Sequence, residues 1–336
     1  MSGSAFRPAW WIPGPHLQTT WGKLLRRHPT LPLVTERWET PDRDFLELHR
    51  LPGAPGEPRL LILHGLEGSP RSHYARGMLL QAMRRGWPAD VLVFRSCGSE
   101  PNRLVRSYHS GETTDLAFVV RQLVRQSPDT PLFITGVSLG GNVLLKWLGE
   151  RGADVPPELR AAVAISVPFD LARSTRHIDR GFSRVYQAHF LRSLKRKAHE
   201  KRRRFPDAIS ASAVDRARTL YEYDDAVTAP VHGFWDADDY YERSSSIRWI
   251  ERIRLPTLLL SAVDDPFLPP DVLDAVAAIA RRTPALHLEF PKRGGHVGFI
   301  GGRIPWRPFY YAEWRALTFL EQNLTRDWGR GIRDEG

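Results

Sequence analysis

A serine between glycines forms the strongest chemical pattern in this sequence. Residues 136–140 read Gly-Val-Ser-Leu-Gly, preceded by an apolar run at 131–135 and followed by a helical pattern from Asn142. This strand–turn–helix setting exposes a nucleophilic serine. Glycines are needed because the serine lies in a strained turn that larger neighbours would crowd. We therefore predict that Ser138 is a nucleophile and that the backbone N–H of Leu139 helps to stabilise an oxyanion.

A serine hydroxyl needs a base to remove its proton, and His296 is the best candidate. In chains with this serine turn the nucleophile comes first, the acid second and the histidine last. Only His287 and His296 follow the apolar run at 257–261. His287 alternates with leucines in a predicted strand, so it is expected to face a helix or solvent. His296 stands in a glycine-rich loop that can carry an imidazole to the serine.

Two neighbouring aspartates could orient this histidine. Residues 261–267 read Ser-Ala-Val-Asp-Asp-Pro-Phe. Asp264 is the preferred acid because it lies three residues after Ser261, where the strand gives way to a turn. Asp265 remains the alternative, since the following proline restricts it to an extended conformation. The acid would hold the imidazole in one tautomer and stabilise the imidazolium ion that forms.

A second oxyanion donor is expected in the loop at 64–68, which reads His-Gly-Leu-Glu-Gly. Its glycine allows a sharp turn, so the backbone N–H of Leu66 can face the nucleophile. His64 precedes the serine, the wrong order for the base, and is expected to order the loop by hydrogen bonding. A zinc site from His64, Glu67 and His73 has no recognised ligand spacing. We expect neither a metal nor an organic cofactor.

Short apolar runs alternate with helical patterns along the chain. Strands are predicted at 59–64, 91–94, 131–135, 161–166, 257–261 and 286–290, and helices near 72–85, 114–125, 142–148, 271–282 and 310–323. This alternation implies an α/β protein with a mostly parallel central sheet flanked by helices. An inserted helical cap is predicted where the alternation breaks. The predicted units are an N-terminal extension at 1–40, a core at 41–167 and 251–325, and a cap at 168–250.

Charge and composition limit the class of partner. The chain has a formal charge of +10, but residues 192–204 hold eight lysines and arginines and one glutamate, so +7 of the total comes from one stretch. We expect 195–204 to be a solvated helix face, with weak attraction to an anionic membrane surface as the alternative; nucleic acid is not expected. The single cysteine, Cys97, fits a reducing compartment. With no signal-peptide pattern or long apolar run, we expect a cytoplasmic protein.

Four further motifs accompany the serine turn. They are Pro-His-Leu-Gln-Thr at 15–19, Phe-Arg-Ser-Cys-Gly at 94–98, Ser-Tyr-His-Ser-Gly at 107–111 and Asp-Asp-Pro-Phe at 264–267. With them the chain resembles the YheT-like branch of the α/β-hydrolases, the AB hydrolase 4 family, which is related to the ABHD1/ABHD3 group. The resemblance implies the α/β-hydrolase fold and a triad of Ser138, Asp264 and His296. Members are described as carboxylesterases or as acylglycerol and phospholipid hydrolases.

These patterns together predict a serine hydrolase that cleaves carboxylic esters through an acyl-enzyme. Its expected partner is a small-molecule or lipid ester with a short or lipid-like acyl group. Thioester or amide hydrolysis and acyl transfer remain open, because pocket shape decides among chemistries on one scaffold. A non-catalytic binding protein is the alternative from a different class.

Overall fold

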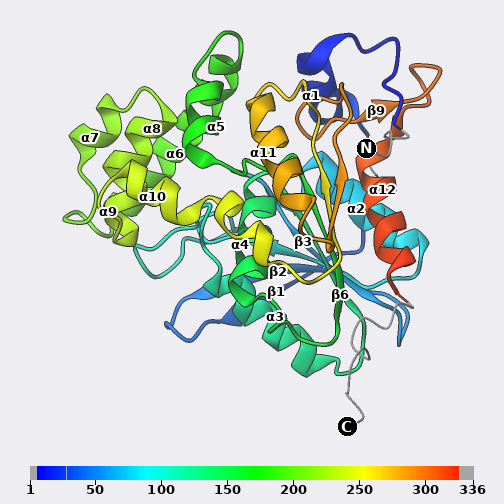
Figure 1. Ribbon diagram of the computed structural model, residues 1–336. Helices are drawn as coiled ribbons and strands as arrows, with labels where there is room; N and C mark the ends of the chain where they lie inside the picture. Colours follow the sequence, from blue (N-terminus) through cyan, green and yellow to red (C-terminus); the bar gives the residue numbers. More distant parts are fainter. Residues whose placement is uncertain (1–5, 28, 325–336) are drawn as a thin grey trace.

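The computed structural model describes residues 6–27 and 29–324. The first five residues of the predicted N-terminal extension and residue 325, the end of the predicted core, lie outside the described residues. An eight-stranded sheet forms the centre of the molecule, with helices on both of its faces (Figure 1). The predicted α/β class is confirmed.

The strand order in the sheet is β1-β2-β4-β3-β5-β6-β7-β8. The bounds are β1 Val34–Glu39, β2 Phe45–Leu51, β3 Arg59–Leu63, β4 Ala89–Val93, β5 Leu132–Val137, β6 Leu159–Ile165, β7 Thr257–Leu260 and β8 Leu286–Glu289. Every neighbouring pair from β4 to β8 is parallel, whereas β1 pairs with β2, and β2 with β4, in antiparallel fashion. The antiparallel edge was not predicted, because β1 is half exposed and carries polar residues rather than an apolar run.

Helices cover the two faces of the sheet in separate layers. One layer contains α2 (His73–Arg84) and α12 (Tyr311–Gln322), and the other contains α3 (Thr114–Gln126), α4 (Leu139–Arg151) and α11 (Pro270–Ala280). Each layer closes its own apolar core against the sheet, so the central strands are buried on both faces. This double burial explains why they read as continuous apolar runs.

Helices α5 to α10 lie between β6 and β7 and form a group beside the sheet (Figure 1). Their bounds are α5 Leu171–Ile178, α6 Ser183–Arg202, α7 Ala211–Arg216, α8 Leu220–Tyr223, α9 Ala229–His232 and α10 Ala237–Ser244. They enclose an apolar cluster of their own, which includes Leu191, Val214 and Tyr223. We propose that residues 168–250 act as the cap. None of the described helices is long and apolar enough to cross a membrane.

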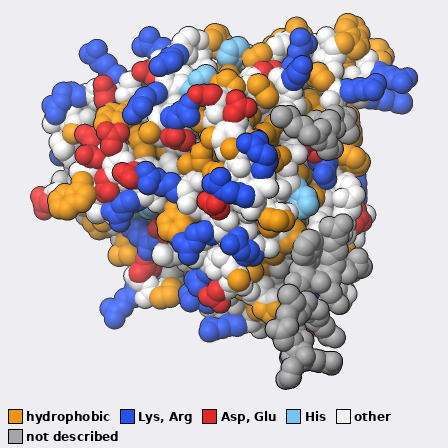
Figure 2. Space-filling model, in the orientation of Figure 1, with side chains coloured by type: hydrophobic (Ala, Val, Ile, Leu, Met, Phe, Trp, Pro, Cys, Tyr) orange, Lys and Arg blue, Asp and Glu red, His pale blue; other side chains and the backbone are white. Residues whose placement is uncertain are grey.

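The basic stretch at 195–204 lies mostly on α6, and two of its lysines face the core. Lys197 donates to Glu67 at 2.7 Å, and Lys201 donates to two core hydroxyls, each at 3.0 Å. Residues four apart share one helix face, and this face packs over the loops of the core. The prediction of a solvated face is therefore wrong for Lys197 and Lys201. On the face seen in Figure 2, lysines and arginines are scattered among acidic side chains.

Two elements near the chain ends were absent from the predicted set. Helix α1 (Gly14–Leu25) lies beside a short hairpin formed by β9 (Ile300–Gly301) and β10 (Phe309–Tyr310) (Figure 1). The backbone N–H of Ala9 donates to the carbonyl of Ile300 at 2.9 Å. The N-terminal extension is thereby joined to the segment that follows β8.

A buried ion network joins the edge strands to α3. Arg95 follows β4, is 2% exposed, and donates two hydrogen bonds of 2.7 Å to Asp115 in the first turn of α3. It also donates to Asp44 at 3.0 Å and to Asp42 at 3.2 Å. Because one guanidinium serves three carboxylates, the beginning of the loop after β4 is held in place.

Replacing Arg95 with Met should destabilise the protein by about 3–5 kcal/mol, because it removes the buried cation that lies between the buried carboxylates of Asp44 and Asp115. Urea unfolding measures this change in the free energy of unfolding. Arg121→Met, at an exposed position on α3, is the matched control and should change it little. Equal losses in the two variants would contradict a structural role for the network.

Candidate active site

Ser138 lies in the turn between β5 and α4. Its backbone has φ 54° and ψ −121°, a strained conformation for a residue with a side chain. Helix α4 begins at Leu139, three residues earlier than predicted, so the N–H of Leu139 belongs to the first turn and has no partner within the helix. A Cβ at Gly140 would lie 2.5 Å from the carbonyl oxygen of His64. Glycine is therefore required where the turn meets the neighbouring loop.

His296 meets the serine from the loop that follows β8. Its Nε2 lies 3.1 Å from the Ser138 hydroxyl oxygen. The ring of Phe267 stacks on the imidazole with a centroid distance of 4.2 Å, which limits its rotation. His287 packs its ring at 5.2 Å from Phe319 of α12, as expected for a residue that faces a helix. The structure thus brings the predicted nucleophile and the predicted base within hydrogen-bonding distance.

The carboxylate beside His296 is that of Asp265, the alternative acid, and not that of the preferred Asp264. Asp265 Oδ2 lies 2.8 Å from His296 Nδ1, and its side chain is fully buried. Its other oxygen accepts the N–H of Phe267 at 2.8 Å. Both oxygens are therefore held, and one faces the imidazole in the orientation that fixes its tautomer.

The turn after β7 explains this outcome. The backbone N–H of Asp265 donates to the carbonyl of Ala262 at 3.2 Å, so the turn spans 262–265 and Asp264 lies inside it. Asp264 accepts the N–H of Gly295 at 2.9 Å, and burial raises the pKa of its carboxyl. The residue before the proline leaves the turn, and its side chain enters the site. Asp264 was expected where the strand gives way to the turn, whereas it lies inside the turn.

His64 orders the loop that carries Leu66, as predicted. The N–H of Phe94 donates to its Nε2 at 3.1 Å, so the proton lies on Nδ1, which donates to the carbonyl of Gly65 at 2.8 Å. Burial lowers the pKa of His64 to about 4, so the imidazole stays neutral. A Cβ at Gly65 would lie 3.2 Å from the Cβ of Ser138. The loop with the predicted oxyanion donor therefore lies against the serine.

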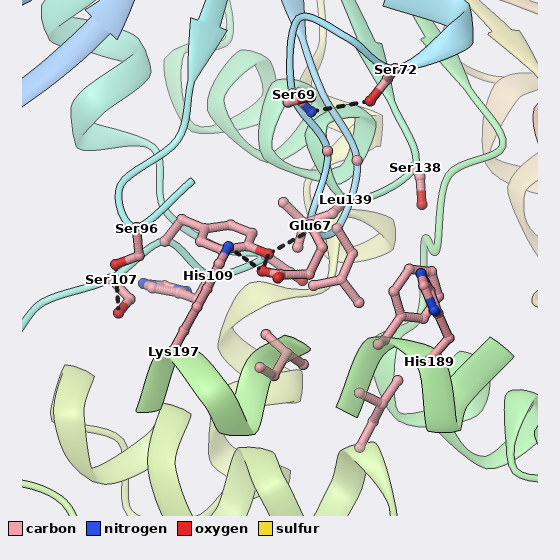
Figure 3. A pocket seen from close by; sticks show the side chains of 18 of the residues that line it. Glu67, Ser69, Ser72, Ser96, Ser107, His109, Ser138, Leu139, His189 and Lys197 are labelled. Atoms are coloured by element: carbon pink, nitrogen blue, oxygen red, sulfur yellow. Dashed lines mark hydrogen bonds and ion pairs between the residues drawn. The ribbon is translucent and has the colours of Figure 1, made fainter. Parts of the chain in front are cut away.

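Glu67, which follows Leu66 in this loop, is held from two sides and has a left-handed backbone with φ 54°. Its N–H donates to the Tyr108 hydroxyl at 2.9 Å, and this hydroxyl donates back to Oε1 at 2.8 Å. Lys197 of α6 donates to the same oxygen at 2.7 Å, and the Ser193 hydroxyl donates to Oε2. Figure 3 shows Lys197 rising from its helix to Glu67. The cap therefore contacts the residue next to Leu66.

A cavity of about 1120 Å³ lies between the core loops, helix α1 and helices α5, α6, α8, α9 and α10. Ser138, Leu139 and His296 line it on the core side, and Phe190 and Leu194 line it from the cap. Figure 3 shows Ser138 on one side and the hydrogen-bonded pair of Ser96 and Ser107 on the other. A substrate in the cavity would therefore contact the serine at one place and polar groups at another.

Asp265→Asn should lower kcat by about 10⁴-fold, because an amide favours the wrong imidazole tautomer. Asp264→Asn is the matched control, since its amide oxygen can still accept the N–H of Gly295. We expect it to retain most of the activity with a p-nitrophenyl ester. The assignment of the acid would be contradicted if Asp264→Asn had the larger effect.

Lys197→Met should lower kcat by about 10- to 100-fold, less than the loss of a whole oxyanion donor, because Glu67 then holds the Leu66 loop less firmly. Steady-state kinetics measures this effect, and Lys197→Arg should restore most of the rate. Lys195→Met serves as the control, because Lys195 on the same helix donates to the carbonyl of Asp215 within residues 168–250. Similar kcat values in all three variants would exclude a link between the cap and the loop of Leu66.

Comparisons with known proteins agree with this geometry. The family model for the α/β hydrolase fold matches residues 58–302. YheT of Escherichia coli (strain K12) is 39% identical over 329 residues, which cover 95% of each chain. Phospholipase ABHD3 of Mus musculus is 30% identical over 249 residues, covering 74% of this chain and 60% of that one. The monoacylglycerol lipase of Saccharomyces cerevisiae is 29% identical over 281 residues, covering 80% and 61%.

Solved structures share the fold at lower sequence identity. The esterase Pf2001 of Pyrococcus furiosus superposes with a TM-score of 0.58 at 14% identity, over 96% of this chain and 98% of that chain. This likeness concerns the fold alone. The family match over residues 58–302 and the similarity to YheT over 95% of each chain go further, because they show the family. The chain therefore belongs to the α/β-hydrolase family, in the branch that contains YheT.

Proposed function

We propose that this protein is a serine hydrolase that cleaves carboxylic esters through an acyl-enzyme. The observation that carries the proposal is the chain of contacts from Asp265 through His296 to Ser138 inside a large cavity. A hydroxyl beside an imidazole that is itself oriented by a buried carboxylate is the arrangement that activates a serine.

In the first half of the reaction, Ser138 Oγ attacks the ester carbonyl while His296 Nε2 takes its proton. The N–H groups of Leu66 and Leu139 stabilise the oxyanion, and Asp265 stabilises the imidazolium. The bond to the alcohol breaks, and His296 gives the proton to the departing oxygen. Water then attacks the acyl-enzyme, with His296 again as the base, and releases the acid. This chemistry needs no metal or organic cofactor.

The shape of the cavity favours a lipid-like ester over a small one. Its volume is slightly above the roughly 300–1,000 Å³ usual for small-molecule pockets. Phe190, Leu194 and Val227 supply apolar side chains from the cap, where an acyl chain could lie. The yeast and mouse relatives are named a monoacylglycerol lipase and a phospholipase, and both names denote hydrolysis of lipids.

Thioester or amide hydrolysis and acyl transfer would use the same serine, so substrate preference has to separate them. A non-catalytic binding role would not require a serine and a histidine oriented toward each other. Weak contact with an anionic membrane surface stays a prediction, to be measured by co-sedimentation with anionic vesicles. With Lys197 and Lys201 turned inward, Arg196, Arg203 and Arg204 are the exposed basic residues of the stretch that could carry it. A cytoplasmic location also stays a prediction.

Labelling with a fluorophosphonate probe tests the mechanism directly. We expect the wild-type protein to be labelled and Ser138→Ala to remain unlabelled. His296→Ala should react at least about 10²-fold more slowly, because the serine has lost its general base. An unlabelled wild-type protein that is correctly folded would overturn the proposal.

A substrate panel then tests the ester assignment. p-Nitrophenyl esters of increasing acyl length should be cleaved with the highest kcat/KM at medium or long chains. Acyl-CoA and anilide substrates of the same acyl length are the controls for thioesterase and amidase activity. Preference for either control would replace the ester assignment while leaving the serine mechanism in place.

A further inference from the structure

The loop that carries His296 has an unusual backbone. Gly295, Val297 and Phe299 all have left-handed φ values, of 60°, 60° and 45°. Such values are costly for β-branched and bulky residues, and they persist only where the surroundings enforce them. Contacts from outside the loop are therefore needed to keep His296 in place.

Three successive N–H groups of this loop donate to side chains from different parts of the chain. The N–H of Gly295 donates to Asp264, and that of Val297 donates to the Ser166 hydroxyl at 3.0 Å. Between them, the N–H of His296 donates to Thr19 Oγ1 at 2.9 Å. Asp264 and Ser166 follow strands of the sheet, whereas Thr19 belongs to α1.

The orientation of the Thr19 hydroxyl suits it to this contact. Its own proton is donated to the carbonyl of Pro15 at 2.7 Å, one turn earlier in α1. The lone pairs are therefore left to accept the N–H of His296. This buried donor would lose its partner if the hydroxyl were removed, and unpaired buried donors are unfavourable.

Helix α1 contacts the loop at further points. Gln18 is 2% exposed, and its side-chain amide accepts the N–H of Ile300 at 2.7 Å and donates to the carbonyl of Ile300 at 3.0 Å. A Cβ at Gly295 would lie 2.5 Å from the Pro15 carbonyl oxygen, and one at Gly298 would lie 2.2 Å from that of Gln18. The loop glycines thus allow α1 to lie directly against the backbone on both sides of the histidine.

We propose that α1 positions the catalytic base, and that Thr19 is the positioning residue for His296. Helix α1 lies outside residues 58–302, the part of the chain that the family model matches. An element outside the matched range would therefore set the distance between His296 and Ser138, through the contact of Thr19 with the histidine loop. The proposal rests on the proposed function, because it assumes that His296 is the base.

A series of Thr19 variants tests this proposal in the full-length protein. Thr19→Ser keeps the hydroxyl acceptor, Thr19→Cys offers only a weak sulfur acceptor, and Thr19→Val offers none. We expect kcat to fall in the order Thr, Ser, Cys, Val, with the Val variant about 10- to 100-fold below wild type, because a small displacement of a catalytic group costs this much. Thr19 also lines the cavity, but its hydroxyl is engaged by the backbone of the histidine loop, so KM should change less than kcat.

Thr318→Val is the matched control. Its hydroxyl donates to the carbonyl of Trp314 one turn earlier in α12, as that of Thr19 does in α1. Thermal unfolding of every variant accompanies the kinetics. The proposal would be overturned if kcat followed the melting temperature of the variants rather than the acceptor strength of residue 19. An unchanged kcat in Thr19→Val would also overturn it.

The Ser and Cys variants keep the proposal testable even if Thr19→Val does not fold. If Thr19→Val fails to fold, the Ser and Cys variants still differ in acceptor strength at nearly equal size, and equal kcat values for these two would contradict the proposal.

Fluorophosphonate labelling of the wild type and of Ser138→Ala is measured in parallel. If the wild type is not labelled, the proposed function fails. If it is labelled and kcat is the same in all Thr19 variants, only the role of α1 fails.

Discussion

The contact between Ser138 and His296 is the constraint on which the rest of this structure depends. The two residues are 158 positions apart, and their side chains have to meet within 3.1 Å. A parallel sheet makes this possible because the carboxyl ends of its strands lie at one edge. The turn after β5 supplies the serine, that after β7 the carboxylate, and the loop after β8 the imidazole.

Strained backbone is concentrated at this edge. Ser138, Glu67 and Val297 all have left-handed φ values, although none is glycine. Each is held by groups from other segments: Ser138 by the strand β6, Glu67 by Tyr108 and the cap, and Val297 by Ser166. The cost of these conformations is local, whereas the hydrogen bonds that offset it come from distant parts of the chain.

Two segments outside the sheet contribute to the same edge. The cap contacts Glu67 through Lys197, and α1 contacts the histidine loop through Gln18 and Thr19. These segments also touch each other, since the ring of His16 lies 4.6 Å from that of Phe182. The loop of His296 and the loop of Leu66 are thus each held by an element that lies outside the sheet and its flanking helices.

The sequence by itself determined the parallel strands of the sheet, the serine turn and the histidine, because each has a local signal. Buried parallel strands read as apolar runs, the strained turn needs its glycines, and His296 follows the last predicted strand. The choice between Asp264 and Asp265 was decided only by the tertiary structure, because the turn directs the side chains of adjacent residues to different places. The roles of Thr19 and Lys197 were also invisible, because their partners lie more than a hundred residues away. Spacing along a chain predicts local geometry, but contacts between distant segments depend on how the whole molecule packs.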